Sequence, residues 1–69
     1  MVYKGVLSGA ETTTYTPAAQ RGWTYKVNVA GLINGEPVEA GDMLICCVDD
    51  TAAATADNVA TVKANWNII

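Results

Sequence analysis

The carboxylates are the side chains in this sequence best suited to chemistry, and most of them fall in its second half. Asp42, Asp49, Asp50 and Asp57 form the densest acidic set, and Ca²⁺ prefers oxygen ligands of this kind. However, Asp42 follows a turn glycine, Asp49 and Asp50 stand where an apolar run stops, and their spacing lacks the alternation of a calcium-binding loop. We therefore interpret all four as solvated turn residues and predict no metal site.

Two further sets of residues could in principle support catalysis. Glu36 and Glu39 could flank a glycosidic bond as a pair of carboxylates, but they lie near a predicted hairpin tip, where they are typical of solubilising residues. Hydroxyl and thiol groups are available as nucleophiles, yet the sequence has no histidine to act as a base. We predict that the chain is not an enzyme and that it uses no cofactor.

The two cysteines, Cys46 and Cys47, are neighbours in the sequence. In a strand, neighbouring side chains point to opposite faces, and a disulfide between them would strain the peptide that joins them. Two thiols without any histidine also fall short of a tetrahedral zinc site. We predict two free cysteines that pack as small apolar residues.

The aromatic residues are Tyr3, Tyr15, Trp23, Tyr25 and Trp66. Trp23 and Tyr25 share the apolar face of an alternating segment, which favours packing within the chain or between subunits. Tyr15 lies in a polar, threonine-rich segment and is the ring for which exposure to solvent is most expected. It is the candidate residue for a glycan contact.

Length and charge narrow the class of protein. Sixty-nine residues form a single domain, residues 1–69, and a chain of this size buries only roughly 60% of its unfolded surface. The net charge is −3, and the four cations are scattered, which disfavours nucleic-acid binding. No apolar run is long enough for membrane insertion, and the N-terminus lacks a secretory segment. With disulfides and metals disfavoured, oligomerisation is the expected source of extra stability.

The stretch Glu39–Asp50 organises the predicted fold. A Gly-Asp turn leads into six apolar residues, Met43–Val48, and an Asp pair ends the run. So short a run between turn signals predicts a central strand buried on both faces. Because the domain is small, one face of this strand is expected to meet the core, and the other is expected to be covered by a loop or a neighbouring subunit. Ile68 and Ile69 at the end of the sequence are expected to be buried between subunits as well.

The remaining segments also favour strands. Alternation over Trp23–Val29 predicts a half-buried strand with Trp23, Tyr25, Val27 and Val29 on the buried face. Asn34-Gly35 is the strongest short hairpin signal. The other expected elements are a first strand at Val2–Leu7, an edge strand at Thr12–Thr16, a loop at Asp49–Asn58 and a final strand starting near Val62 or Asn65.

These elements predict an all-β fold, a small antiparallel sandwich or open barrel of about five or six short strands. The sequence ends on two isoleucines, which suggests that the natural chain continues and that residues 1–69 are a segment of a longer protein.

Five segments, taken in order, resemble a module of bacteriophage tail-fibre and head-fibre proteins: Val2–Gly5, Gly22–Val27, Glu39–Cys46, Asp49–Thr51 and Asn65–Ile69. The modules share a similar skeleton, with an aromatic-Lys-Gly strand, a Gly-Trp-Thr-Tyr strand, a Gly-Asp turn before an apolar strand, and a closing strand that begins with Trp. This sequence departs from the modules at Asn58–Lys63, where the loop before Trp66 is longer and more apolar than the loop expected in such a module.

The resemblance implies a structural protein of the virion, made in the bacterial host cytoplasm and assembled as a homotrimer with other virion proteins. It also implies a contribution to host attachment, and it transfers no catalytic or binding residue. The alternative is a carbohydrate-binding module that recognises host-surface glycans, which requires two exposed rings on a common face.

Overall fold

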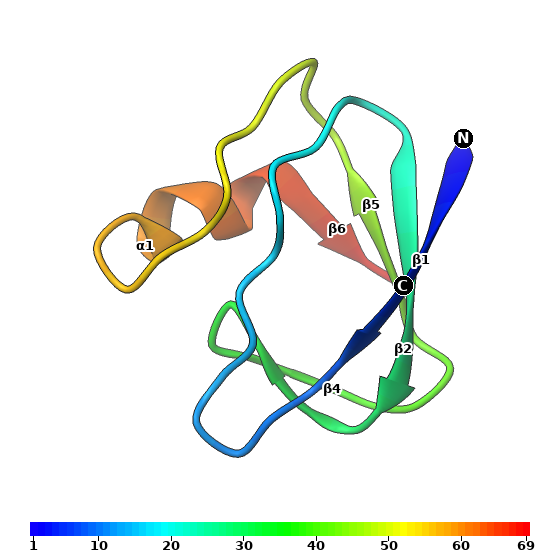
Figure 1. Ribbon diagram of the computed structural model, residues 1–69, viewed down its shortest axis with the longest axis vertical. Helices are drawn as coiled ribbons and strands as arrows, with labels where there is room; N and C mark the ends of the chain where they lie inside the picture. Colours follow the sequence, from blue (N-terminus) through cyan, green and yellow to red (C-terminus); the bar gives the residue numbers. More distant parts are fainter.

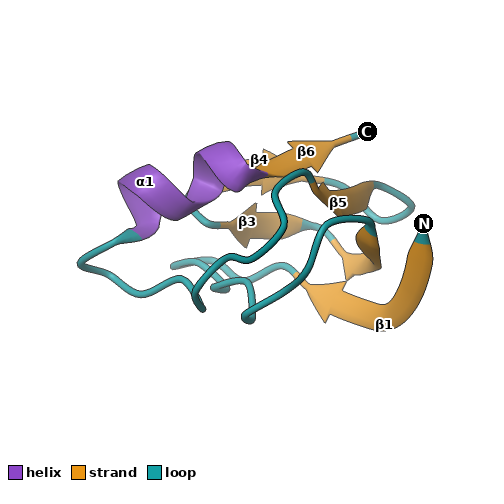
Figure 2. Cartoon of the chain, turned by 90° about the horizontal axis from the view of Figure 1, so that it is seen from above, coloured by secondary structure: helices purple, strands orange, loops and turns teal.

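The computed structural model describes residues 1–69 and measures 28 × 26 × 15 Å along its principal axes. Six short strands carry the fold, and the helical segment lies on the opposite side of the molecule from the first strand (Figures 1 and 2). The elements are β1 (Val2–Ser8), β2 (Trp23–Val29), β3 (Gly31–Ile33), β4 (Glu36–Val38), β5 (Met43–Cys46), α1 (Val59–Val62), the 3₁₀ turn η1 (Lys63–Asn65) and β6 (Trp66–Ile68). The all-β prediction and the expected number of strands are confirmed.

Four of the strands form one sheet in the order β1-β2-β5-β6, and β3 pairs with β4 in a second sheet. The β2–β5, β5–β6 and β3–β4 pairs are antiparallel, as predicted, but β1 and β2 are parallel. Parallel strands need a crossover of about a dozen residues instead of a tight turn, and residues 9–22 supply it. The antiparallel prediction is therefore wrong for this one pair.

The predicted hairpin is confirmed. Asn34 and Gly35 both have positive φ, 54° and 78°, the combination that a type I′ turn requires and that an Asn-Gly pair tolerates. The hairpin is tied to the end of β1 by a close crossing of two backbones. A Cβ added at Gly9 would lie 2.6 Å from the nitrogen of Gly31, so glycine is required where the chain leaves β1 and passes β3.

The predicted edge strand at Thr12–Thr16 is wrong, because side chains take over the hydrogen bonds that a strand ladder would make. The Asn34 side chain accepts from the Thr16 amide at 3.1 Å and donates to the Thr16 hydroxyl at 3.0 Å. The Thr13 hydroxyl accepts from the Gly35 amide at 2.8 Å. Bonds of this kind compete with regular pairing, so the segment runs beside the hairpin with only an isolated bridge from Thr14 to Ile33.

The strand predicted over Met43–Val48 lies inside the sheet, between β2 and β6, but ends at Cys46. Leu44 and Cys46 are buried, Met43 and Ile45 are half-buried, and Cys47 is exposed. Within the chain only one face of the strand is buried, so contact of one face with the core is confirmed, whereas cover of the other face by a neighbouring subunit stays a prediction. Both cysteines are free and occupy opposite faces.

Residues 49–58 form no strand or helix, as predicted, but the chain then forms α1, a short helix that the sequence did not predict. Just before α1, the Thr55 amide donates to the Asn58 side chain at 2.6 Å and the Asn58 amide donates to the Thr55 hydroxyl at 3.3 Å. These local bonds begin a helical turn that buries Val62. The final strand follows at Trp66, close to the predicted start at Asn65.

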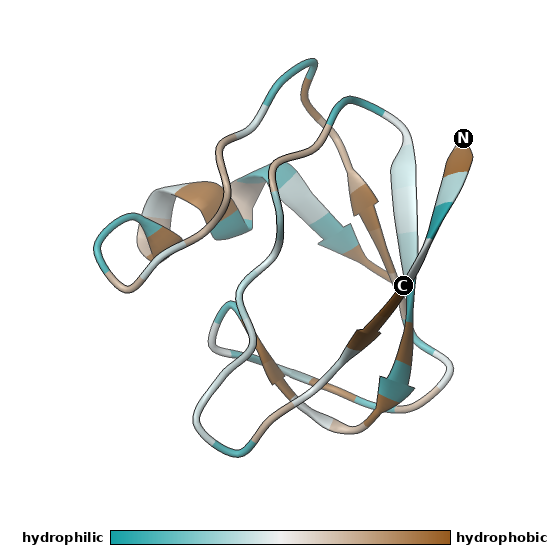
Figure 3. Ribbon diagram, viewed as in Figure 1, coloured by the Kyte–Doolittle hydropathy of each residue, from teal (hydrophilic) through white to brown (hydrophobic).

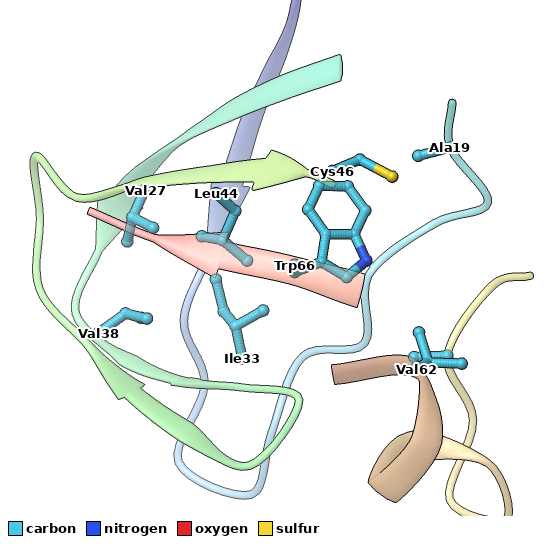
Figure 4. Packing of buried hydrophobic residues seen from close by; sticks show 9 residues of the cluster. Ala19, Val27, Ile33, Val38, Leu44, Cys46, Val62 and Trp66 are labelled. Carbon is cyan, nitrogen blue, oxygen red and sulfur yellow. The ribbon is translucent and has the colours of Figure 1, made fainter. Parts of the chain in front are cut away.

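The core lies between the four-stranded sheet on one side and the hairpin, crossover and α1 on the other. Figure 4 shows Val27 and Leu44 pointing from the sheet toward Ile33 and Val38 of the hairpin. Only 13 of 69 residues are buried, so the core is thin, as expected for a chain of this size. The exposed surface of 3933 Å² is close to the roughly 4,100 Å² expected for a compact monomer of this mass.

The burial prediction for β2 is only partly confirmed. Trp23, Tyr25 and Val27 pack on the core, but Val29 is exposed because the register shifts after Val27 and pairs Val29 with Ser8, on the side away from the core. Thr24, expected on the polar face, is fully buried. In register, Thr24 lies between the larger Tyr3 and Ile45 on the neighbouring strands.

Candidate functional site

No pocket is present on the surface, and no group of three or more Cys, Asp or Glu side chains is placed to hold a metal ion. No helix is long and apolar enough to cross a membrane. The candidate site is therefore a surface, and the four-stranded sheet provides it. One face of this sheet packs on the core, and the other has no layer over it.

We call this second surface the outer face. The strand register defines it, because residues that pair across strands share a face. One row runs across all four strands from Tyr3 to Asn67, and the next runs from Val6 to Ile69, since Met43 and Ile69 exchange two backbone hydrogen bonds of 3.1 and 2.9 Å. The outer face consists of Tyr3, Val6, Ser8, Thr24, Lys26, Val29, Met43, Ile45, Asn67 and Ile69.

Most of the outer face is apolar, and much of it is open to solvent. The exposed fractions of Tyr3, Val6 and Ile69 are 59%, 52% and 68%, and Met43 and Ile45 are half-buried between them. Figure 3 shows the hydrophobic colour at both ends of β1 and along β5. The polar Thr24 and Lys26 of β2 lie between the apolar residues of β1 and those of β5. Exposed apolar residues gathered on one face of a small domain are typical of an interaction site.

A bulge in β1 brings Tyr3 and Val6 onto one face. In a regular strand, residues three apart point to opposite faces. The register with β2 shifts between Tyr3 and Gly5, so that Lys4 is the extra residue and Tyr3 and Val6 pair with Thr24 and Lys26. Neither residue was predicted as part of an interface. A glycine inside a predicted strand, Gly5, was the sequence signal of a bulge, and this glycine adopts a φ of 146°.

The outer face carries a single charge, that of Lys26. The other lysine of the sheet, Lys4, lies over the Trp23 ring with its ammonium nitrogen 4.1 Å from the ring centroid, a cation–π contact. None of the seven carboxylates lies on a strand of this sheet. The sheet is therefore nearly uncharged, while the acidic residues occupy the loops and the hairpin.

The acidic residues considered as a calcium site are not brought together as a metal-binding group. The Asp42 side chain accepts from the Glu39 amide at 2.9 Å and closes the turn before β5. Asp49 accepts from Arg21 at 2.8 Å between two loops. This hydrogen bond and the Asp49 charge raise the pKa of Arg21 above its ordinary value.

The two glutamates are also separate in their contacts. Glu36 forms an ion pair of 3.4 Å with Lys63, which links β4 to η1, whereas Glu39 takes part in the turn with Asp42 through its backbone. Neither residue faces a pocket, since the surface has none.

The rings divide as the sequence predicted. Trp23 and Tyr25 are half-buried and pack against the core, and the Tyr25 and Trp66 ring centroids are 5.9 Å apart at 53°. Tyr15 is exposed, at 39%, beside the hairpin, as predicted, and Tyr3 is exposed as well, at 59%. The contact of Tyr15 with a glycan stays a prediction.

Comparison of the chain with protein families, curated proteins and solved structures finds no match. The outer face and the residues that form it are therefore the basis for proposing a function.

Proposed function

We propose that this chain is a structural module that assembles with copies of itself, as a homotrimeric building block of a bacteriophage fibre or another virion appendage. The observation that supports assembly is the apolar, uncovered outer face. The fibre context and the trimer come from the resemblance of the Gly22–Val27 and Gly41–Cys46 segments to fibre modules. In that setting the module would meet other virion proteins and contribute to host attachment.

The energetics favour covering the outer face. Fully burying a side chain such as valine or isoleucine contributes about 1.5–3 kcal/mol, and Tyr3, Val6 and Ile69 all have more than half of their surface available. A domain with so thin a core gains proportionately more from this burial than a larger one would. Because the face carries only Lys26, association removes few charges from water.

The test is the mass in solution of the wild type and of two lysine variants. Val6 lies on the outer face and Tyr15 lies beside the hairpin, and both are exposed, at 52% and 39%. We expect the wild type to sediment at about 22 kDa, three times the 7.2 kDa of one chain. Val6→Lys should sediment as a folded monomer because it places a charge in the buried interface, while Tyr15→Lys should remain assembled.

A second measurement uses the native thiols as reporters. Cys47 is exposed, and its backbone pairs with Asn65 next to the outer face. Cys46 is buried and serves as the unreactive reference. Alkylation of Cys47 should slow as protein concentration rises and should become concentration-independent in Val6→Lys. A wild type that stays monomeric at high micromolar concentration would exclude the proposal.

The alternative function, glycan recognition, receives less support from the geometry. It requires two exposed rings on one face, but Tyr3 pairs with β2 on the outer face whereas Tyr15 lies beside the hairpin. A glycan array probed with the wild type and with Tyr15→Ala tests this alternative directly.

A further inference from the structure

The four-stranded sheet has two free edges, β1 and β6, and an edge strand presents a row of unpaired N–H and C=O groups. At the two ends of β6, the Asn65 carbonyl accepts a hydrogen bond from the Cys47 amide at 2.8 Å, and Ile69 exchanges two backbone hydrogen bonds with Met43. Because alternate residues of an antiparallel strand direct their backbone groups to opposite sides, the N–H and C=O of Ile68 point to the free edge.

The edge of β1 is open in the same way, but only over short lengths. The Val2 amide donates to the Gly22 carbonyl at 2.8 Å, so the next residue, Tyr3, directs its backbone outward. Register shifts after Tyr3 and after Leu7 leave the regular stretch Gly5–Leu7 between them. This stretch has three residues, as does β6, so the two edges offer pairing surfaces of similar length.

Apolar side chains are concentrated at these two edges. Six of the eight exposed large hydrophobic residues lie on or next to β1 and β6, namely Met1, Val2, Tyr3, Val6, Ile68 and Ile69. Sheets that remain monomeric usually protect their edges with outward charges. Here the only charge on either edge strand is Lys4, and it is folded over Trp23, so no like charges oppose contact between the edges.

The strand directions determine how two copies can join. Because β1 is parallel to β2, β2 antiparallel to β5 and β5 antiparallel to β6, β1 and β6 run the same way. Rotation about an axis along the strands preserves that direction, so β6 of one copy meets β1 of the next as a parallel pair. Contact between two different edges is heterologous, and such contacts form a closed ring when the rotation closes.

We propose that β6 of a second copy of this chain occupies the β1 edge, and that three such junctions close a ring whose outer faces line the axis. This inference rests on the proposed function and specifies its geometry. It makes both edges of every sheet internal, which removes the unpaired backbone groups and covers the apolar side chains at once.

The experiment uses cysteine pairs in a Cys47→Ser background, in which the remaining thiol, Cys46, is buried. Val6→Cys and Asn67→Cys place one thiol at each edge of the outer face. If β6 of one copy meets β1 of the next in another register, Tyr3→Cys, in the adjacent row, takes the place of Val6→Cys. Each variant is oxidised alone, and the Val6→Cys and Asn67→Cys proteins are then mixed. Tyr15→Cys mixed with Asn67→Cys is the control, because Tyr15 is exposed beside the hairpin and not on either edge strand.

The expected result is a covalent dimer from the mixture and little from either variant alone, with a ladder that stops at three chains when one chain carries both cysteines. If Val6→Cys or Tyr3→Cys forms a covalent dimer by itself, β1 of one copy meets β1 of another in an isologous contact, and the proposed β6–β1 junction is wrong. An assembled wild type with no cross-link in any pair would overturn edge pairing but leave the proposed function intact, whereas a monomeric wild type would overturn both.

Discussion

The two faces of the four-stranded sheet are made by the same strands and meet different surroundings. Along β5, Leu44 and Cys46 point to the core and are buried, while Met43 and Ile45 point to the outer face and are half-buried. Both sets are apolar. The strand thus carries enough apolar surface for two packing layers, but the chain itself supplies only one.

The difference lies in what covers each face. The hairpin, the crossover and α1 all lie on the core side, held there by the Asn34–Thr16 bonds and the Gly9–Gly31 crossing. The outer face has no such layer within the chain. We infer that stability within the chain depends mainly on the core face, and that association depends mainly on the outer face.

The largest expected effect is a difference in stability between substitutions at two adjacent residues of β5, one on each face of the sheet. Leu44→Ala should lower the free energy of unfolding by about 2–5 kcal/mol, because it leaves a cavity in a closed core. Ile45→Ala should cost less, about 1–2 kcal/mol, since a half-buried side chain encloses no cavity. Urea unfolding at two protein concentrations measures both.

The concentration dependence sharpens this comparison. The stability loss in Ile45→Ala should include a part that appears only at concentrations where the wild type is assembled, because association stabilises the folded state. The loss in Leu44→Ala should be present even in dilute protein. Equal losses at 44 and 45 in dilute protein would contradict the assignment of the faces.

The second prediction concerns the cover of the core face. Asn34→Ala should cost about 1–3 kcal/mol, because the amide of the buried Thr16 loses its partner. The positive φ of Asn34 adds about 1–2 kcal/mol for alanine. Asn34→Gly removes the side chain but tolerates the backbone, so it should be the milder variant. Thermal unfolding followed by circular dichroism measures the two, and equal losses would show that the side-chain bonds alone matter.

The features that the sequence predicted well are those specified by neighbouring residues. Asn34 and Gly35 determine a tight hairpin by their own backbone preferences. The alternation from Trp23 to Val27 and the bounded apolar run at Met43 likewise depend on only a few consecutive side chains. Each of these patterns predicted the correct element at the correct place.

The features that could not be predicted depend on residues far apart in the chain. The parallel pairing of β1 with β2 is decided by how residues 9–22 cross the core, and the path of Thr12–Thr16 is decided by a side chain 18 residues away. Propensity described Thr12–Thr16 as a strand because threonine favours extended backbone, but hydrogen bonds to Asn34 took the place of ladder bonds.

The candidate site was predicted in part. The apolar run and the terminal isoleucines indicated an uncovered surface on β5 and β6, and the structure places Ile45 and Ile69 there. The contribution of β1 could not be predicted because of the bulge at Lys4, which reverses the face to which the following residues of β1 point. Tyr3 and Val6 share a face only because of that extra residue, and no simple alternation pattern indicates this.

The smallest expected effect lies outside both faces. Arg21 and Asp49 form an ion pair of 2.8 Å between two loops, with both side chains largely exposed to solvent. Solvent and salt screen such a pair, and many contribute nothing measurable. Arg21→Ala should therefore leave both the urea midpoint and the mass in solution unchanged.

The pair should also add no pH dependence near neutrality. The hydrogen bond and charge of Asp49 raise the pKa of Arg21, and a raised pKa stabilises the folded state at every pH below the ordinary value for arginine, with the gain lost only above the raised value. Wild type and Arg21→Ala should therefore show parallel stability between about pH 6 and 8, within the range of roughly pH 5 to 8 where folded proteins are most stable. Altered assembly in Arg21→Ala would show that the loops at residues 21 and 49 belong to the interface, which would extend it beyond the outer face.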